Sequence, residues 1–294
     1  MNTLRFDRLA RLAALGLLPL ALAAQAQTST PAPAAGDDRG FSFFMGMGAQ
    51  RLTYRETPSI LPVESEARVT NPLLITGAVY AVTPDVLFAL DAESTFAPRT
   101  VTEEWTATAS SIGGVPVNNP LLQTNRFSLQ ETKTKLLGHY RLSGAWFALG
   151  GASFQTQSFK RYGFAAGPDN IVALPADRTV EESASEVLLL GGVALESERV
   201  RNTGSHYSVR ATVGVPVWRR LENTAFPNYS FDGTKGYDLA LAGRYSWAVV
   251  PNVHVGLWGQ WSYAERDSQV QGSVELPKAT LSGLAAGIEF LWKL

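Results

Sequence analysis

The clearest pattern in the chain is an alternation of apolar and mixed positions over its last eleven residues. One series is wholly apolar and carries aromatics toward its end: Leu284, Ala286, Ile288, Phe290, Trp292 and Leu294. The other series mixes small and charged residues with one leucine: Ala285, Gly287, Glu289, Leu291 and Lys293. Because successive side chains of a β-strand point to opposite faces, this period of two predicts a strand with one apolar and one polar face.

The same alternation recurs along the chain, interrupted by clusters of Gly, Pro, Asn and Asp, with almost no helical periodicity. We expect ten strands, at residues 40–54, 72–83, 86–97, 126–142, 145–159, 184–196, 206–219, 237–250, 253–265 and 280–294. The apolar face gathers aromatics toward strand ends, at Tyr207, Tyr237, Tyr245, Trp247, Trp261, Tyr263 and Trp292. Trp258 is an exception on the polar face.

The expected connections alternate between short and long. Short links fall at 83–85, 142–144 and 250–252, with a longer one at 196–205, while polar segments occupy 55–71, 98–125, 160–183, 220–236 and 266–279. Short turns at one end and long loops at the other are typical of outer-membrane barrels, and these strands reach the ~9–11 residues that cross a bilayer. The fold class we predict is therefore all-β, a ten-stranded antiparallel up-and-down transmembrane β-barrel with both termini periplasmic.

A soluble, lipocalin-like barrel also alternates, with its apolar face turned inward around a ligand. Three features favour the membrane version: a polar face rich in small residues, aromatics toward strand ends, and five long segments at one end. The last strand is then expected to close the ring against the first, near Phe41, Phe43 and Met45.

The start of the chain indicates export. Arg5, Arg8 and Arg11 precede an apolar run over 12–24, which is too short to span a bilayer, and Ala24-Gln25-Ala26 is a small-x-small cleavage site. We expect a signal peptide at 1–26, a flexible Pro- and Ala-rich lead-in at 27–39 and the barrel at 40–294. Without the signal, 22 basic and 25 acidic residues remain, a charge of −3 that offers no footprint for nucleic acid. Cysteine is absent, so no disulfide framework is expected.

The signal peptide, the loop asymmetry and the terminal segment 287–294 together resemble the Gram-negative outer-membrane β-barrel superfamily. The resemblance implies localisation in the bacterial outer membrane, contact with membrane lipid and lipopolysaccharide, and recognition of the C-terminal strand by the barrel-assembly machinery. Members usually end on a final aromatic residue. This chain matches the alternation at Ile288, Phe290 and Trp292 but ends on Leu294.

If the apolar series faces outward, a set of ionisable residues of both signs faces the lumen: Asp91, Glu93, Lys133, Lys135, Arg141, Arg210, Asp238, Arg244, Glu289 and Lys293. Such charges must be paired or hydrated, because isolated burial costs several kcal/mol or more. Barrels of about eight strands are filled by side chains, whereas open pores appear near sixteen. We therefore expect a charge-plugged lumen, with a narrow channel for small solutes as the alternative.

Catalytic patterns are weak. Ten strands is the size of the omptin surface proteases, which resemblance would place at the extracellular rim with acidic residues and a histidine, but His139, His206 and His254 all fall near expected periplasmic links. There is no Cys, no Gly-x-Ser-x-Gly elbow and no metal-ligand spacing. Ser205 and His206 are adjacent, so they would point to opposite faces. We predict a non-enzymatic protein without cofactor or metal, and a surface hydrolase is the less favoured alternative.

Two surface features suggest partners. Trp105, Phe164 and Phe226 lie in the expected loops, where they would anchor an extracellular ligand or pack loop on loop. The basic residues Lys160, Arg161, Arg219 and Arg220 lie near the outer strand ends, where they would contact lipopolysaccharide phosphates or form an ordinary solvated rim. The function we expect is that of a surface or structural protein that displays long extracellular loops.

Overall fold

The computed structural model describes residues 40–169, 176–197 and 204–294. The expected signal peptide and lead-in, residues 1–39, lie outside the described residues. Among those that are described, no helix is long and apolar enough to cross a membrane. The described part is built from antiparallel β-strands.

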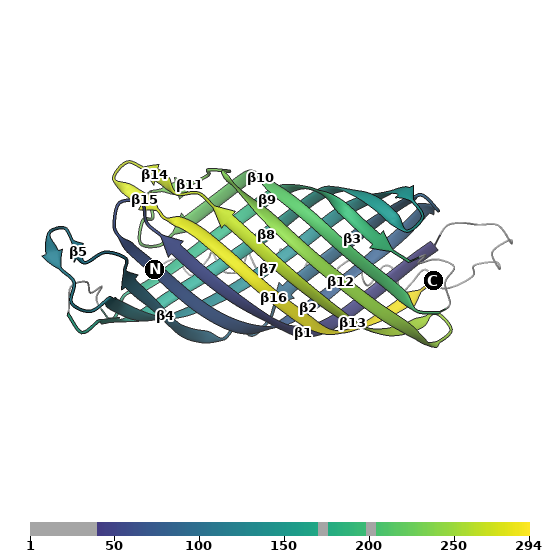
Figure 1. Ribbon diagram of the computed structural model, residues 1–294, viewed down its shortest axis with the longest axis horizontal. Helices are drawn as coiled ribbons and strands as arrows, with labels where there is room; N and C mark the ends of the chain where they lie inside the picture. Colours follow the sequence, from purple (N-terminus) through teal and green to yellow (C-terminus); the bar gives the residue numbers. More distant parts are fainter. Residues whose placement is uncertain (1–39, 170–175, 198–203) are drawn as a thin grey trace. The chain divides into compact units, whose positions relative to one another are not determined.

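Ten strands form a closed ring, as predicted (Figure 1). In order around the ring they are β1 (Gly40–Thr57), β2 (Val63–Thr83), β3 (Val86–Thr95) with β4 (Thr100–Ala107), β7 (Leu121–Ser143), β8 (Trp146–Ala166), β9 (Thr179–Glu196), β10 (His206–Asn223), β12 (Gly236–Val250), β13 (Val253–Arg266) and β16 (Lys278–Lys293). Five short strands lie in the connections: β5 (Ser111–Ile112), β6 (Val115–Pro116), β11 (Ser230–Phe231), β14 (Gln269–Gln271) and β15 (Val274–Leu276).

The last strand closes the ring, which confirms the prediction. β16 pairs with β13 on one side and with β1 on the other, in a register that places Met45 opposite Phe290. The backbone N–H of Leu294 also donates to the carbonyl of Phe41 at 2.8 Å. Every strand of the ring therefore has two neighbours. In the described residues, β10 pairs with β12 only as far as Gly214, and beyond it β10 pairs with β9 and, at Leu221 and Glu222, with β11.

The pairing of β2 with β3 and β4 is irregular where β3 ends and β4 begins. Leu73 of β2 pairs with Thr95 of β3, and Ala67 pairs with Glu103 of β4. The five residues 68–72 thus face the seven residues 96–102. The buried Asn71 side chain bridges the irregularity, because its Oδ1 accepts from the Arg99 N–H at 2.8 Å and its Nδ2 donates to the Leu129 carbonyl at 2.9 Å.

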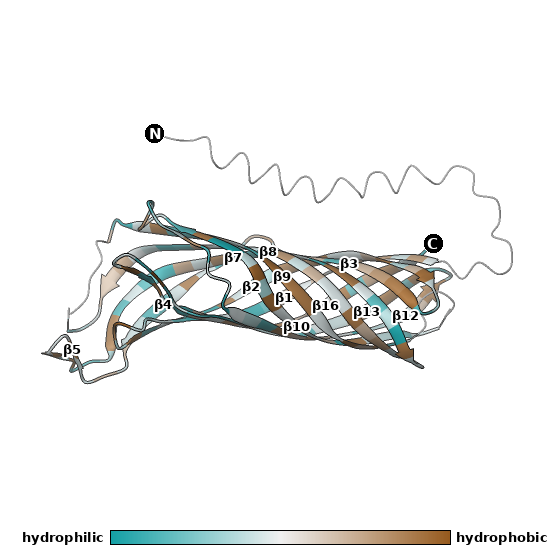
Figure 2. Ribbon diagram, turned by 90° about the horizontal axis from the view of Figure 1, so that it is seen from above, coloured by the Kyte–Doolittle hydropathy of each residue, from teal (hydrophilic) through white to brown (hydrophobic). Residues whose placement is uncertain are grey.

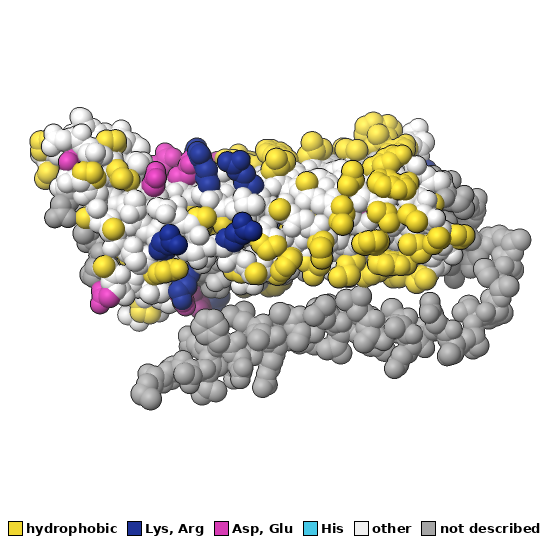
Figure 3. All heavy atoms as spheres, turned by 90° about the horizontal axis from the view of Figure 1, so that it is seen from below, with side chains coloured by type: hydrophobic (Ala, Val, Ile, Leu, Met, Phe, Trp, Pro, Cys, Tyr) yellow, Lys and Arg dark blue, Asp and Glu magenta, His cyan; other side chains and the backbone are white. Residues whose placement is uncertain are grey.

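The outward faces carry an apolar belt near the end of the barrel that holds Gly40 and Lys293, which we call the terminal end. Figure 2 shows strand segments of hydrophobic residues, in brown, toward that end, and Figure 3 shows hydrophobic side chains gathered there. Along β16, outward Ile288 is 48% exposed and inward Glu289 is 2% exposed. Aromatic rings contact one another near the margins of the belt: Phe43 stacks on Trp292 at one margin, and the rings of Tyr237 and Tyr263 pack at a tilt at the other.

The opposite end, which we call the distal end, corrects the prediction of five long loops. Much of each polar segment is strand: β1 runs to Thr57 and β2 begins at Val63. The connections that remain are 58–62, 108–120, 167–178, 224–235 and 267–277. Beyond the belt the outward face turns polar, so the apolar–polar alternation disappears although the backbone pairing continues. Trp105 and Phe164 accordingly lie in strands, where Phe164 is buried and Trp105 half-buried, and only Phe226 is exposed.

Candidate functional site: the ion-paired interior

The inward side chains form alternating apolar and charged layers along the barrel. The inward series of β7 shows this order from its distal end: Asn125, then Phe127 and Leu129, then Glu131, Lys133 and Lys135, then Leu137 and His139. Neighbouring strands bring matching groups to the same level, because the antiparallel register fixes their relative height. Charged side chains thus meet one another across the interior.

The layer nearest the terminal end is organised by two arginines. Arg210 forms ion pairs with Asp91 at 2.7 Å and with Glu196 at 2.9 Å, which join β10 to β3 and β9. On the other wall, Arg244 lies 3.7 Å from Glu289. Its guanidinium also lies 3.8 Å above the centre of the Phe44 ring, so the cation packs on an aromatic face as well as beside a carboxylate.

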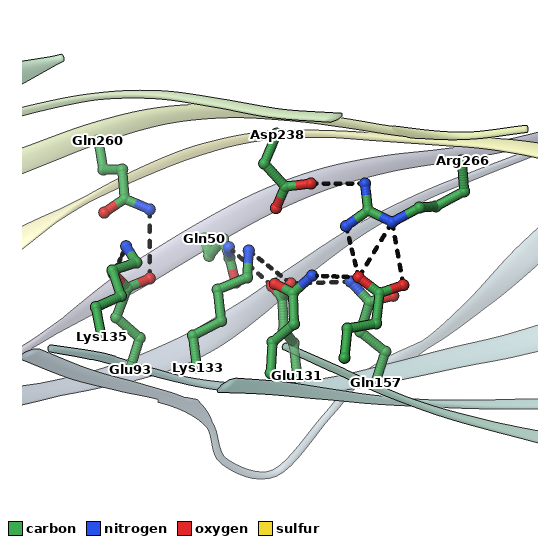
Figure 4. Close-up of polar contacts among 11 residues, drawn as sticks. Gln50, Glu93, Glu131, Lys133, Lys135, Gln157, Asp238, Gln260 and Arg266 are labelled. Carbon is green, nitrogen blue, oxygen red and sulfur yellow. Dashed lines mark hydrogen bonds and ion pairs between the residues drawn. The ribbon is translucent and has the colours of Figure 1, made fainter. Parts of the chain in front are cut away.

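The middle layer contains the two lysines of β7 (Figure 4). Lys135 pairs with Glu93 of β3 at 2.6 Å, and Gln260 from the opposite wall donates to the same carboxylate at 3.3 Å. Lys133 pairs with Glu131 at 2.7 Å. Two side-chain amides donate hydrogen bonds to the same Glu131 carboxylate, Gln157 at 3.1 Å and Gln50 at 3.5 Å.

Next toward the distal end, Glu186 of β9 forms ion pairs with two arginines. Arg266 lies 2.5 Å from its carboxylate and Arg219 lies 2.7 Å away, while Gln155 donates at 2.8 Å. Arg266 also reaches Asp238 of β12 at 2.6 Å, as Figure 4 shows. This group ties β8, β9, β10, β12 and β13 together through side chains.

The most distal charged group is centred on Arg161 of β8. Its guanidinium binds Glu103 and Glu56, each at 2.8 Å. Asn125 donates to Glu103 at 2.8 Å and accepts from the indole of Trp105 at the same distance. The guanidinium also lies between 5.5 and 5.8 Å from the ring centres of Tyr54, Phe127 and Trp105. We call Arg161 with Glu56, Glu103 and the nearby Glu182 the distal charge cluster.

Burial perturbs the acid–base properties of this cluster. Burial and the neighbouring Glu56 carboxylate raise the pKa of Glu182 to about 7, although Asn223 donates to it at 2.8 Å. Burial and Glu56 also raise the pKa of Tyr54. Burial alone would lower the pKa of Arg161, but the carboxylates of Glu103 and Glu56 outweigh it and raise that pKa. Arg161 is therefore a fixed cation, whereas Glu182 is the member that titrates near neutral pH.

Apolar clusters separate the charged layers. The distal one consists of Leu52, Tyr54, Ala67, Val69, Phe127, Leu129, Phe159 and Leu281. Toward the terminal end, Phe44, Leu73, Ile75, Trp258, Ala285 and Leu291 form another. The interior spaces between described residues include one of about 30 Å³ beside Glu182 and one of about 40 Å³ beside Lys133. Each holds no more than a few water molecules.

The comparisons with known proteins concern the fold. No protein-family model and no curated protein matches the chain. Among solved structures, the outer membrane protease OmpT from Escherichia coli is similar with a TM-score of 0.62 and 11% identity, over 91% of this chain and 99% of that chain. The chain has the fold of an outer-membrane β-barrel. The translocator domain of autotransporter NalP from Neisseria meningitidis gives a TM-score of 0.38 and 9% identity, over 97% of each chain.

The structure places the ten charged residues expected in the lumen on the inward series of their strands. Eight belong to the layers described above: Asp91, Glu93, Lys133, Lys135, Arg210, Asp238, Arg244 and Glu289. Arg141 lies at the terminal rim instead, 3.1 Å from Asp85 and bound to the carbonyl of Pro84 in the β2–β3 turn. Lys293 lies at the same rim, at the end of β16.

The expected lipopolysaccharide contacts require a correction. Arg161 and Arg219 are buried inside the barrel, where they bind interior carboxylates. Their sequence neighbours Lys160 and Arg220 point outward, with side chains 49% and 60% exposed. Adjacent residues of a strand face opposite sides, so only one member of each basic pair can reach the outer surface.

Several interior residues escaped the sequence analysis. Glu56, Glu103, Glu182 and Arg266 lie in or at the edge of segments interpreted as loops, so no facing direction was assigned to them. Glu131 was also missed, although it shares the inward series of a predicted strand with Lys133. The period of two along that strand would have identified it as an inward residue.

The histidines lie at the terminal end. His206 begins β10, His254 is the second residue of β13, and His139 lies four residues before the end of β7. Ser197 Oγ lies 2.6 Å from Nδ1 of His206, but the same oxygen accepts from the Tyr207 backbone N–H at 2.9 Å, which makes it part of the β9–β10 link. Within the described ranges, no group of three or more His, Asp or Glu side chains is placed to hold a metal ion.

Proposed function

We propose that this protein is a non-enzymatic barrel of the bacterial outer membrane, with a closed interior and a distal end that faces outside the cell. The observation that carries the proposal is the layered interior, in which buried charges bind one another between apolar clusters. An interior built in this way would hold the strands of the barrel together rigidly and would not conduct ions.

The outward belt supports the membrane setting. On β12 the outward series runs from Tyr237 to Trp247 without a charge. Ten residue steps cover roughly 33 Å of strand, or about 25 Å of height at the usual tilt of a membrane barrel. That height matches the apolar band of outer-membrane proteins. Over this span β12 pairs with β13 and, from Asp238 to Ser246, with β10, so its backbone groups are satisfied within the sheet.

The interior supports a structural role. A conducting pore needs a continuous hydrated path, whereas the spaces of about 30 and 40 Å³ lie between side chains that contact across the barrel. Breaking such a contact would leave an uncompensated buried charge, at a cost of several kcal/mol. We therefore favour the closed barrel over a narrow channel.

Histidine placement supports a non-enzymatic role. OmpT is named as a protease, so a protease is the enzyme that the fold similarity suggests. A rim protease with a histidine base needs that residue at the outer mouth, and all three histidines of this chain lie at the terminal end. The distal connections would instead display a surface for an extracellular partner, with Phe226 as an exposed anchor. The terminal strand would serve the assembly machinery during insertion.

Planar-bilayer recording tests the closed interior. We expect no stepwise currents from the folded protein, whereas a sixteen-stranded porin in the same bilayer provides the positive control. Insertion is checked separately by heat-modifiable mobility in gel electrophoresis. Reproducible unitary steps from an inserted sample would replace the closed barrel with the narrow channel. Peptide hydrolysis that disappears in His139→Ala, His206→Ala or His254→Ala would overturn the non-enzymatic assignment.

A further inference from the structure

A basic groove crosses the outer surface just beyond the apolar belt, on β13, β16, β1 and β2. Arg51 and Arg55 of β1, Arg68 of β2 and Lys278 of β16 line it together with Thr and Ser hydroxyls. The groove is open to solvent and has a volume of about 620 Å³. Figure 3 shows dark blue side chains gathered next to the hydrophobic field of this face.

Strand register concentrates the arginines around one hydroxyl. Thr53 lies directly opposite Arg68 of β2 on one side and Ser282 of β16 on the other. Arg51 and Arg55 are two residues away from Thr53 on the same face of β1, a distance of about 7 Å. Arg51, Arg55 and Arg68 therefore flank Thr53 on the outer surface, and Arg55 and Arg68 share the carboxylate of Glu66. Arginines spaced in this way suit a tetrahedral oxyanion.

The carboxylates of the groove lie mainly on its distal side. Glu66 bridges Arg55 and Arg68, at 2.5 and 2.6 Å, and Glu265 pairs with Lys278 at 2.8 Å. The cations of these pairs are 45–58% exposed, so each pair contributes little to stability and is screened by salt. Among the ion pairs of the described residues, none includes Arg51, which lies nearest the belt on β1.

We propose that this groove binds the phosphate groups of lipid headgroups in the outer leaflet, and this inference rests on the membrane setting proposed above. Arg51 and Arg68 are the first outward charges beyond the belt on their strands, at the height where headgroup phosphates meet the hydrocarbon. No outward charge occupies the corresponding positions of β1 and β16 at the terminal margin, where Phe43 and Trp292 stack. The groove therefore marks the leaflet that is dense in phosphate.

Lipid binding to the folded protein tests the site. Barrels in neutral-detergent micelles are titrated with bis-phosphorylated lipid A or with the dephosphorylated form, and the bound lipid is counted by native mass spectrometry. We expect the wild-type protein to prefer the phosphorylated lipid, and Arg51→Ala/Arg68→Ala to bind it about tenfold more weakly, because charge-assisted hydrogen bonds are lost. The matched control, Lys160→Ala/Arg220→Ala, removes two outward basic residues on β8 and β10. Both lie outside the groove and pair with Glu181 and Glu222, so this variant should bind like wild type, and the groove rather than the rim positions would be the headgroup site.

Three results would overturn the proposal: equal binding of both lipids, equal losses in the two double variants, or displacement of the lipid by inorganic phosphate at matched concentration. The last result would identify a free-anion site. Heat-modifiable mobility of the same protein in vesicles reports membrane insertion independently. Failure of the membrane assignment is thereby distinguished from failure of the headgroup site.

Discussion

At the scale of single residues, Glu182 couples the interior to pH. Its carboxyl is a buried member of the distal charge cluster. Burial raises its pKa most, and the Glu56 carboxylate raises it further, to about 7. The ordinary value is 4.5. The folded state therefore holds a proton that the unfolded chain has already released over the range between these two values.

The sign of the pH effect follows from this difference. The contribution of Glu182 to stability is fully present below pH 4.5, declines as the pH rises from 4.5 to 7, and is absent above about 7. Glu182→Gln keeps the neutral form at every pH. We expect the variant to gain stability relative to wild type as the pH rises, by about 3 kcal/mol between pH 4.5 and 8. Urea unfolding of the protein in micelles at the two pH values measures this change.

Glu181 provides the control on the same strand. It points outward and pairs with Lys160 at 3.1 Å, with its side chain 39% exposed. Glu181→Gln should keep the pH dependence of the wild-type protein. A constant difference between Glu182→Gln and wild type across this pH range would show that Glu182 is ionised in the fold throughout.

At the scale of the strand, alternation explains both what the sequence predicted and what it did not. Ten strands and their outward faces follow from a period of two, because outward positions such as Ile288 and Phe290 are apolar and inward neighbours such as Gly287 and Glu289 are small or charged. The apolar–polar alternation ends where the outward face becomes polar. Residues 55–57 continue β1, yet their composition is that of a loop.

The interior partners lie beyond the reach of sequence reasoning for a different reason. Arg161 meets Glu103, 58 residues away, and Glu56, 105 residues away. Strand parity can place each of these side chains inside. The level at which they meet depends on the register of the five strands β1, β2, β4, β7 and β8 and on the irregular pairing near Asn71. Local pattern carries no information about that register.

The neighbouring residues Lys160 and Arg161 provide a matched test on one strand. Arg161→Met removes the cation between Glu103 and Glu56 and leaves their charges buried, so we expect a loss of about 3–5 kcal/mol in unfolding free energy. Lys160→Met removes an exposed partner of Glu181 and should change stability by about 0.5 kcal/mol or less. Urea unfolding of both variants in micelles measures the contrast.

A second substitution separates charge from packing. Adding Glu103→Gln to Arg161→Met removes one uncompensated carboxylate, and we expect part of the lost stability to return. Similar losses in Arg161→Met and Lys160→Met would contradict the inward placement of Arg161. No recovery in the double variant would assign the loss to packing on Tyr54, Phe127 and Trp105.

At the scale of the whole barrel, closure links all the other properties. β16 pairs with β1 over sixteen positions, from Ser42 opposite Lys293 to Thr57 opposite Lys278. The same three strands β16, β1 and β2 carry the basic groove outside and Gln50 of the middle layer inside. Opening this seam would therefore expose the interior charges and divide the groove at once.

An engineered disulfide across the seam tests closure directly, since the chain has no cysteine of its own. Met45 and Phe290 are directly opposite, and opposite residues of an antiparallel pair lie about 4.5–5.5 Å apart at Cα, within the range that a disulfide spans. We expect Met45→Cys/Phe290→Cys to cross-link on oxidation of the folded protein. After boiling without reductant it should run as a looped chain of altered mobility, and reductant should restore the linear band. In the control, Met45→Cys/Leu284→Cys, the second cysteine faces Arg51, about 20 Å along the strand, so it should stay uncross-linked. Equal cross-linking in both pairs, or none in either, would contradict the ring.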